Sequence, residues 1–172
     1  LEKNNRLSLK YGCNVYLKRE DLQDVRSFKI RGAYNKINSL SHNEKSKGIV
    51  CASAGNHAQG VAYCSSNLNI KADIFVAENT PLQKINSIKK FSNNDCSLHI
   101  KGSNFDEAYN LSQEFCQKNN SVYIHPFGDE DVIYGQGTIG VEIYDLINSD
   151  IIIGCVGGGG LMSGISLYSK AV

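Results

Sequence analysis

Hydrophobic positions along this chain repeat with two different spacings, and the two spacings alternate. Short runs that are apolar or alternate with polar residues are typical of strands, and they occupy residues 14–18, 48–52, 72–76, 97–100, 121–125 and 151–156. Between these runs the apolar residues recur every three to four positions, which predicts amphipathic helices. This order predicts an α/β fold with a largely parallel sheet.

The predicted helices have definite starts and apolar stripes. Ser27 is expected to cap a helix, and Thr80 is expected to cap another whose first residue is Pro81. Further helices are expected over 57–66, 105–116 and 135–147, with a last one after the glycines at 157–160. The stripe of the first helix is expected to comprise Ile30, Ala33, Tyr34 and Ile37.

Composition narrows the class of protein. The 172 residues are 41% hydrophobic and 20% charged, which suits one globular domain or two small lobes. A net charge of +1 gives no reason to expect nucleic acid or a membrane as a partner. Six cysteines without a Cys-x-x-Cys pair, and no secretory signal, predict reduced and mostly buried thiols in a cytoplasmic protein without a metal site.

The first of three motifs is Ser27–Ala33, SFKIRGA, which places the amine of Lys29 at a helix start. A lysine amine reacts with an aldehyde when burial leaves part of it unprotonated. A lone helix lysine is usually solvated, so only the other motifs favour this chemistry. Arg26 and Arg31 are expected to be surface or structural charges.

The second motif is Ser53–Gly60, SAGNHAQG, at a transition from strand to helix. The free N–H groups of a helix start favour anions such as a carboxylate. Ser53 and Asn56 add side-chain donors, whereas His57 is expected to be structural. A plain capped turn explains the same pattern equally well.

The third motif is the glycine run Gly157–Gly160, followed by Leu161. A glycine loop between an apolar strand and a helix suits a phosphate. No register satisfies Gly-x-Gly-x-x-Gly, and no Lys-Ser or Lys-Thr follows, so a nucleotide-binding regulatory module is disfavoured.

With these three motifs in this order, the chain resembles the threonine dehydratases among the fold-type II pyridoxal-phosphate enzymes. KRED at 18–21, HPF at 125–127 and GQGT at 135–138 resemble the biosynthetic branch. The resemblance implies a three-layer α/β fold with mostly parallel sheets in two lobes, like that of the tryptophan synthase β chain. It implies a small lobe over about 20–124, with 1–19 and 125–172 in a large lobe that is incomplete at its C-terminus.

The resemblance also implies a cofactor and the residues that hold it. Pyridoxal 5'-phosphate would bond covalently to Lys29, the catalytic residue, and its ring hydroxyl would meet Asn56. The phosphate would be held by Gly157, Gly158, Gly159, Gly160 and Leu161. The substrate carboxylate would be bordered by Ser53, Ala54, Gly55, Asn56 and His57.

The implied activity is the dehydration and deamination of L-threonine to 2-oxobutanoate and ammonia, the first step of isoleucine biosynthesis. L-serine would give pyruvate by the same chemistry, and the parent enzyme is expected to be a homo-oligomer. A catabolic serine/threonine dehydratase or a serine racemase shares the same motifs. An inactive truncated remnant is an alternative of a different class.

Overall fold

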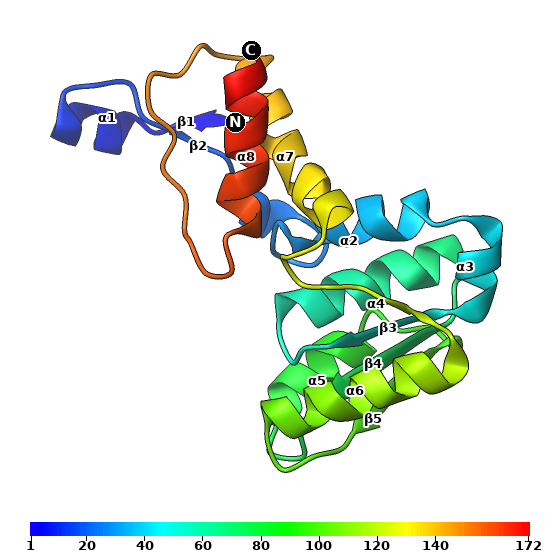
Figure 1. Cartoon of the computed structure of the whole chain (residues 1–172). Helices are drawn as coiled ribbons and strands as arrows, with labels where there is room; N and C mark the ends of the chain where they lie inside the picture. The colour runs from blue at the N-terminus through cyan, green and yellow to red at the C-terminus, as the bar shows by residue number, and fades with distance from the viewer.

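A four-stranded parallel sheet forms the centre of one part of the molecule in the computed structural model, which describes residues 1–172 (Figure 1). Its strand order is β5-β4-β3-β6. The strands span Ile49–Ala52 (β3), Ala72–Val76 (β4), Cys96–Ile100 (β5) and Val122–Tyr123 (β6). All residues of β3 and β4 are buried, as expected for central strands covered on both faces.

The remaining elements pack around this sheet or lie apart from it (Figure 1). A short antiparallel pair joins β1 (Glu2–Lys3) to β2 (Tyr16–Leu17), and a 3₁₀ turn, η1, spans Glu20–Leu22. The helices span Asn5–Tyr11 (α1), Lys29–Ser39 (α2), His42–Lys47 (α3), Asn56–Leu68 (α4), Leu82–Lys89 (α5), Phe105–Asn119 (α6), Glu130–Tyr144 (α7) and Gly160–Ala171 (α8).

Two apolar clusters make the sheet the middle of three layers. On one face, α4 packs against the sheet, and α2 and α5 pack against α4, in one apolar cluster that includes Ile37, Val61 and Ile88. On the other face, α6 covers Val50 and Phe75. The predicted three-layer α/β arrangement with a parallel sheet is therefore confirmed.

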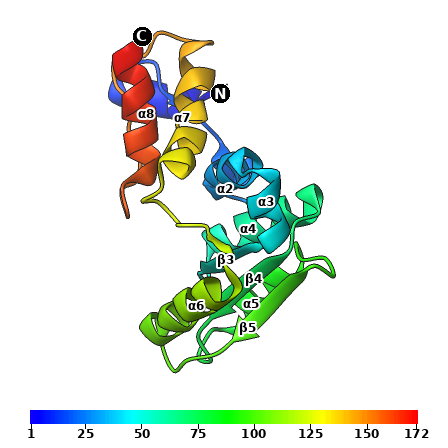
Figure 2. The same ribbon diagram turned by 45° about the vertical axis from the view of Figure 1, so that its right-hand side comes forward.

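The α7–α8 pair forms a second packed part. Its own cluster is built on Ile139, Ile143 and Ile165. Figures 1 and 2 show α7 and α8 side by side and away from the sheet, with α2 between the two parts. The proposed lobe division, 20–124 against 1–19 and 125–172, stays a prediction.

The strand predicted at 151–156 does not form, and this expectation was wrong. Its apolar side chains are largely exposed, with Ile151, Ile153 and Val156 at 78%, 93% and 71%. A strand needs a neighbour to pair its N–H and C=O groups, and no strand of this structure runs beside the segment. The glycine run and the helix after it, α8, are present as predicted.

Several helix starts differ from the prediction because caps and packing decide them. Helix α7 begins at Glu130, five residues early, because Asp129 Oδ1 accepts from the N–H groups of Asp131 (2.9 Å) and Val132 (3.3 Å). The N-cap residue of α5 is Pro81 rather than Thr80, so its first helical residue is Leu82.

The first turn of α2 also departs from the prediction. Ser27 does not cap the helix, because the N-cap residue is Phe28 and no side chain makes the cap hydrogen bond. Tyr34 is 50% exposed and lies outside the apolar stripe. The buried face of α2 runs instead through Gly32, Ala33 and Ile37, since α7 packs on the Gly32 side.

The six cysteines differ in burial. Cys51, Cys64 and Cys116 are buried, whereas Cys13 and Cys155 are exposed, so the expectation of mostly buried thiols holds only in part. No helix has the length and apolar content that crossing a membrane requires.

One prediction concerns the stability of α6. Asn104 Oδ1 accepts from Glu107 N–H at 3.0 Å and caps this helix. We expect Asn104→Ala to lower the free energy of unfolding by about 1 kcal/mol in urea titrations. Asn104→Asp keeps the acceptor and is the matched control. An equal loss in both variants would show that the cap does not stabilise α6.

Candidate functional site

Lys29 is the first residue of α2 and is half-buried. Its Nζ donates a hydrogen bond to the carbonyl oxygen of Pro126 at 2.6 Å, 97 residues further along the chain. Burial lowers the pKa of the Lys29 amine below its ordinary value. A larger share of this amine is therefore unprotonated than in a solvated lysine, which is the state that reacts with an aldehyde.

The second motif forms the turn between β3 and α4 and packs close to Lys29. The side-chain oxygen of Ser53 accepts from Gly55 N–H at 3.2 Å, and Asn56, the first residue of α4, is exposed. A Cβ at Gly60 would lie 3.2 Å from the Lys29 backbone, so glycine allows α4 to approach α2. Asn56 lies one turn before Gly60 and therefore shares the face that α4 presents to Lys29.

Two members of this motif behave differently from their neighbours. The side chain of Ala54 packs against the sheet core, so only its backbone is free to meet a ligand. A Cβ built at Gly55 would meet nothing within 4 Å, so close packing does not require glycine there.

His57 is a buried member of the motif, 3% exposed. Its Nε2 pairs with the Ile124 carbonyl oxygen at 2.9 Å, while Nδ1 has no hydrogen-bond partner. Burial lowers the pKa of His57 to about 4, so the ring is neutral at pH 7 and donates from Nε2. This geometry agrees with the structural role expected for His57.

The pKa of His57 makes a pH-dependent contribution to stability. Its folded pKa of about 4 lies below the unfolded value near 6.5, so the unfolded chain binds the proton more tightly. This contribution is complete above pH 6.5 and falls by about 3 kcal/mol as the pH drops to 4. His57→Gln should lose less stability over that interval, in urea titrations at pH 7 and pH 4.5. Equal losses in both proteins would contradict the burial argument.

The glycine run leads directly into α8. Gly159 is the N-cap residue with φ +86°, a left-handed conformation that favours glycine, and no side chain caps the helix. The N–H groups of Gly160, Leu161 and Met162 therefore have no acceptor within the helix. The Leu161 side chain packs in the α7–α8 cluster, which leaves its backbone N–H as the group that can meet an anion.

One segment, Ile124–Phe127, contacts all three motifs. Ile124 accepts from His57, and Pro126 accepts from Lys29. The Phe127 ring lies where a Cβ at Gly158 would be, and a Cβ at Gly160 would lie 2.9 Å from the Phe127 carbonyl oxygen. His125 Nδ1 accepts from Phe127 N–H (3.3 Å) and Gly128 N–H (2.7 Å), which folds the segment into a turn.

The comparison with protein families decides the class of this site. The family described as "Pyridoxal-phosphate dependent enzyme" matches residues 1–172, the whole chain. The chain belongs to this family. The predicted cofactor, pyridoxal phosphate, is the cofactor of the family and is thereby confirmed.

Known relatives agree with this family. The biosynthetic L-threonine dehydratase IlvA of Bacillus subtilis (strain 168) is 48% identical over 174 aligned residues, which cover 100% of this chain and 41% of that protein. The processed threonine deaminase isoform 2 of Solanum lycopersicum superposes with a TM-score of 0.91 at 43% identity, over 100% of this chain and 47% of the other. The serine racemase of Dictyostelium discoideum superposes with a TM-score of 0.90 at 35% identity, over 98% and 54%. This chain therefore spans about half or less of each relative.

The residues present fit pyridoxal phosphate. The half-buried Lys29 amine suits the cofactor aldehyde, and the uncapped start of α8 supplies N–H donors for a phosphate. Side chains at Gly158 or Gly160 would collide with Phe127, so these two positions accept only glycine while the loop backbone stays close to Phe127.

Sequence reasoning missed the residues that join the motifs. The Pro126 carbonyl and the Phe127 ring make the link between Lys29 and the glycine run. The HPF triplet was the available signal, but by itself it does not indicate which residues it contacts.

Proposed function

We propose that this chain supplies part of the active site of a biosynthetic L-threonine dehydratase, which converts L-threonine to 2-oxobutanoate and ammonia. The observation that carries the proposal is the contact of Ile124–Phe127 with all three motifs. The similarity to the biosynthetic L-threonine dehydratase of Bacillus subtilis supports the choice of threonine.

Lys29 has two tasks in this proposal. Its neutral amine would hold the cofactor covalently, and the same amine, when free, would take the proton from the substrate Cα as general base. Pyridoxal phosphate, when bound, supplies an electron sink that stabilises negative charge at Cα. The Pro126 carbonyl orients the Lys29 amine through the 2.6 Å hydrogen bond.

The other motifs bind and orient. Backbone N–H groups of Gly157–Leu161 hold the phosphate at the start of α8. The Ser53–His57 turn binds the substrate carboxylate at the start of α4, and the exposed Asn56 side chain meets the ring hydroxyl. The buried His57 ring keeps this turn attached to Ile124.

A serine racemase is the second candidate, because the Dictyostelium discoideum enzyme of that name superposes closely on this chain. The two candidates differ in their products. A dehydratase forms 2-oxobutanoate from L-threonine, whereas a racemase forms D-serine from L-serine. The predicted cytoplasmic location and homo-oligomeric state stay predictions.

The decisive experiment incubates the intact protein with pyridoxal phosphate and either L-threonine or L-serine. Borohydride reduction and peptide mapping identify the residue that holds the cofactor, and product analysis measures oxo acid and D-serine. We expect an adduct on Lys29 and 2-oxobutanoate as the main product. D-serine in excess of oxo acid would favour the racemase, and an adduct on another residue would refute the site.

A further inference from the structure

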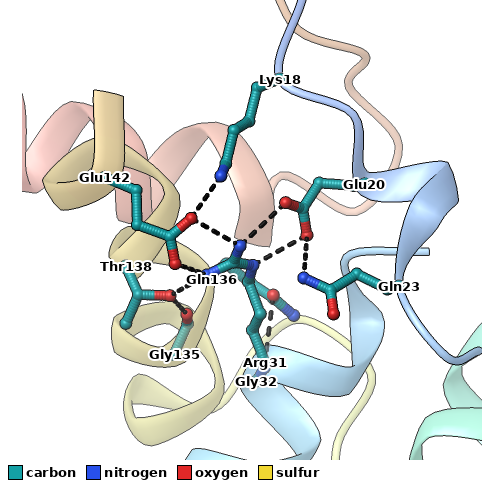
Figure 3. A network of polar contacts seen from close by, with 9 residues as sticks. All are labelled: Lys18, Glu20, Gln23, Arg31, Gly32, Gly135, Gln136, Thr138 and Glu142. Atoms are coloured by element: carbon teal, nitrogen blue, oxygen red, sulfur yellow. Dashed lines mark hydrogen bonds and ion pairs between the residues drawn. The ribbon is translucent and has the colours of Figure 1, made fainter. Parts of the chain in front are cut away.

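Arg31 lies two residues after Lys29 on α2, and its guanidinium is held from two sides (Figure 3). Nε and Nη2 donate to the two Glu20 oxygens, both at 2.8 Å. Nη1 and Nη2 donate to the two Glu142 oxygens at 2.6 and 2.9 Å, and Nη1 also donates to Thr138 Oγ1 at 3.0 Å. A guanidinium has five N–H groups, so every donor of Arg31 is used.

The two carboxylates come from different elements. Glu20 belongs to η1, which precedes α2, and Glu142 belongs to α7. The side chains of Arg31 and Glu20 are only 12% and 14% exposed. Lys18 also pairs with Glu142, so the formal charges of these four side chains sum to zero. The cluster therefore joins three segments of the chain in one balanced group.

This cluster holds the first turn of α2, where Gln136 Oε1 of α7 also accepts a hydrogen bond from Gly32 N–H at 3.3 Å. No side chain caps the helix, and the buried Ser27 hydroxyl next to the start has no hydrogen-bond partner. Arg26, just before it, has φ +57°, an uncommon conformation for a residue other than glycine. Arg31 is the third residue of α2, so its side chain ties the first helical turn, which begins with Lys29, to η1 and α7.

The backbone and the side chain of Lys29 are therefore both attached to α7 or to the segment that precedes it. Its backbone is tied through Arg31 to α7, and its Nζ bonds to Pro126, in the segment that leads into α7. Helices α2 and α7 also pack closely at two glycines, since a Cβ at Gly135 would lie 2.7 Å from Gly32 Cα. This contact does not depend on Arg31. We therefore expect that loss of the hydrogen bonds from the Arg31 guanidinium loosens the first turn of α2 and leaves α2 and α7 in contact.

We propose that Arg31, held by Glu20 and Glu142, is a positioning residue that fixes the first turn of α2 so that the Lys29 amine meets the cofactor. This inference rests on the role proposed above for Lys29. The proposal also assigns a role to the KRED motif, because its residues Lys18 and Glu20 belong to the cluster. An ion pair that is largely removed from solvent costs desolvation, so it adds little net stability. A role in fixing the position of the first turn of α2 is consistent with that small net stability.

The test replaces Arg31 by lysine, which keeps the charge but offers three N–H donors on a flexible stem. Arg19→Lys is the matched control, because Arg19 forms a two-bond pair with Asp21 (2.7 and 2.8 Å) that is exposed. In the intact protein, borohydride trapping measures how fast pyridoxal phosphate becomes fixed on Lys29. A second series in a Lys29→Ala background measures the Kd of non-covalent cofactor binding.

A positioning role predicts that the rate of fixation on Lys29 changes and that the Kd of non-covalent binding does not. We expect Arg31→Lys to slow fixation on Lys29 about tenfold or more, as for a misplaced reacting group. In the Lys29→Ala background the same change should alter the Kd by less than about twofold, because every guanidinium donor of Arg31 is bonded to Glu20, Glu142 or Thr138 and none is left for the cofactor. Arg19→Lys should change neither quantity.

Each remaining outcome has a definite meaning. Equal losses in both backgrounds would show a merely structural role and overturn the inference, and so would unchanged fixation in Arg31→Lys. A wild-type protein with no adduct on Lys29 would refute the proposed function and the inference together. If Arg31→Lys does not fold, Glu142→Gln tests the same cluster, because Glu142 is 44% exposed and its replacement removes one charged acceptor. It should then show the same difference between the two series, and its absence would overturn the inference.

Discussion

Lys29→Ala is expected to abolish covalent attachment of pyridoxal phosphate and to suppress threonine turnover. The loss of the general base alone lowers turnover by about 10²- to 10⁴-fold. The variant should fold, because the Lys29 side chain makes one hydrogen bond, to Pro126, and removing a half-buried amine relieves desolvation. Borohydride trapping with peptide mapping measures the attachment, and 2-oxobutanoate formation measures the turnover.

Lys84→Ala is the matched control, because Lys84 also lies in the first turn of a helix, α5, but is exposed. This variant should attach the cofactor and turn over threonine like the parent protein. Attachment that survives in Lys29→Ala would show that another amine holds the cofactor. That result would refute the assignment of Lys29 as the residue that holds the cofactor.

Local sequence pattern was sufficient for the sheet. The apolar runs at 48–52 and 72–76 match β3 and β4 within one residue, because both are central strands buried on both faces. The run at 151–156 is equally apolar, yet it forms no strand. An apolar run shows that a segment favours burial. It does not show whether another strand, from elsewhere in the sequence, is available to pair with it.

Long-range contacts account for what the sequence did not show about the site. SFKIRGA was sufficient to propose Lys29 as the residue that holds the cofactor, but its bond to Pro126 joins positions 97 residues apart. Arg31 was expected to be a surface or structural charge, and only the fold shows that it is structural, with a side chain that is 12% exposed. Arg26 is exposed, which agrees with a surface position. Equal charges five residues apart thus differ because α7 covers one of them and leaves the other in solvent.

Gly159→Asp is expected to weaken cofactor retention strongly. Gly159 precedes the free N–H groups of α8, and a carboxylate placed there would oppose a bound phosphate. Two unit charges 4 Å apart repel by about 1 kcal/mol in water and about 4 kcal/mol near a protein surface. The Kd for pyridoxal phosphate should therefore rise about fivefold to a thousandfold.

Gly159→Asn separates this charge effect from backbone strain. Gly159 has φ +86°, which asparagine and aspartate tolerate to a similar degree, and a Cβ there meets only Ser163 Oγ at 3.9 Å. The two side chains have nearly the same shape, so the difference between their Kd values reports the added charge. Cofactor titrations in 0.05 and 0.5 M salt should narrow that difference, since salt screens exposed charges. Equal Kd values for both variants would mean that the phosphate binds elsewhere, and the glycine run would then serve only the packing against Phe127.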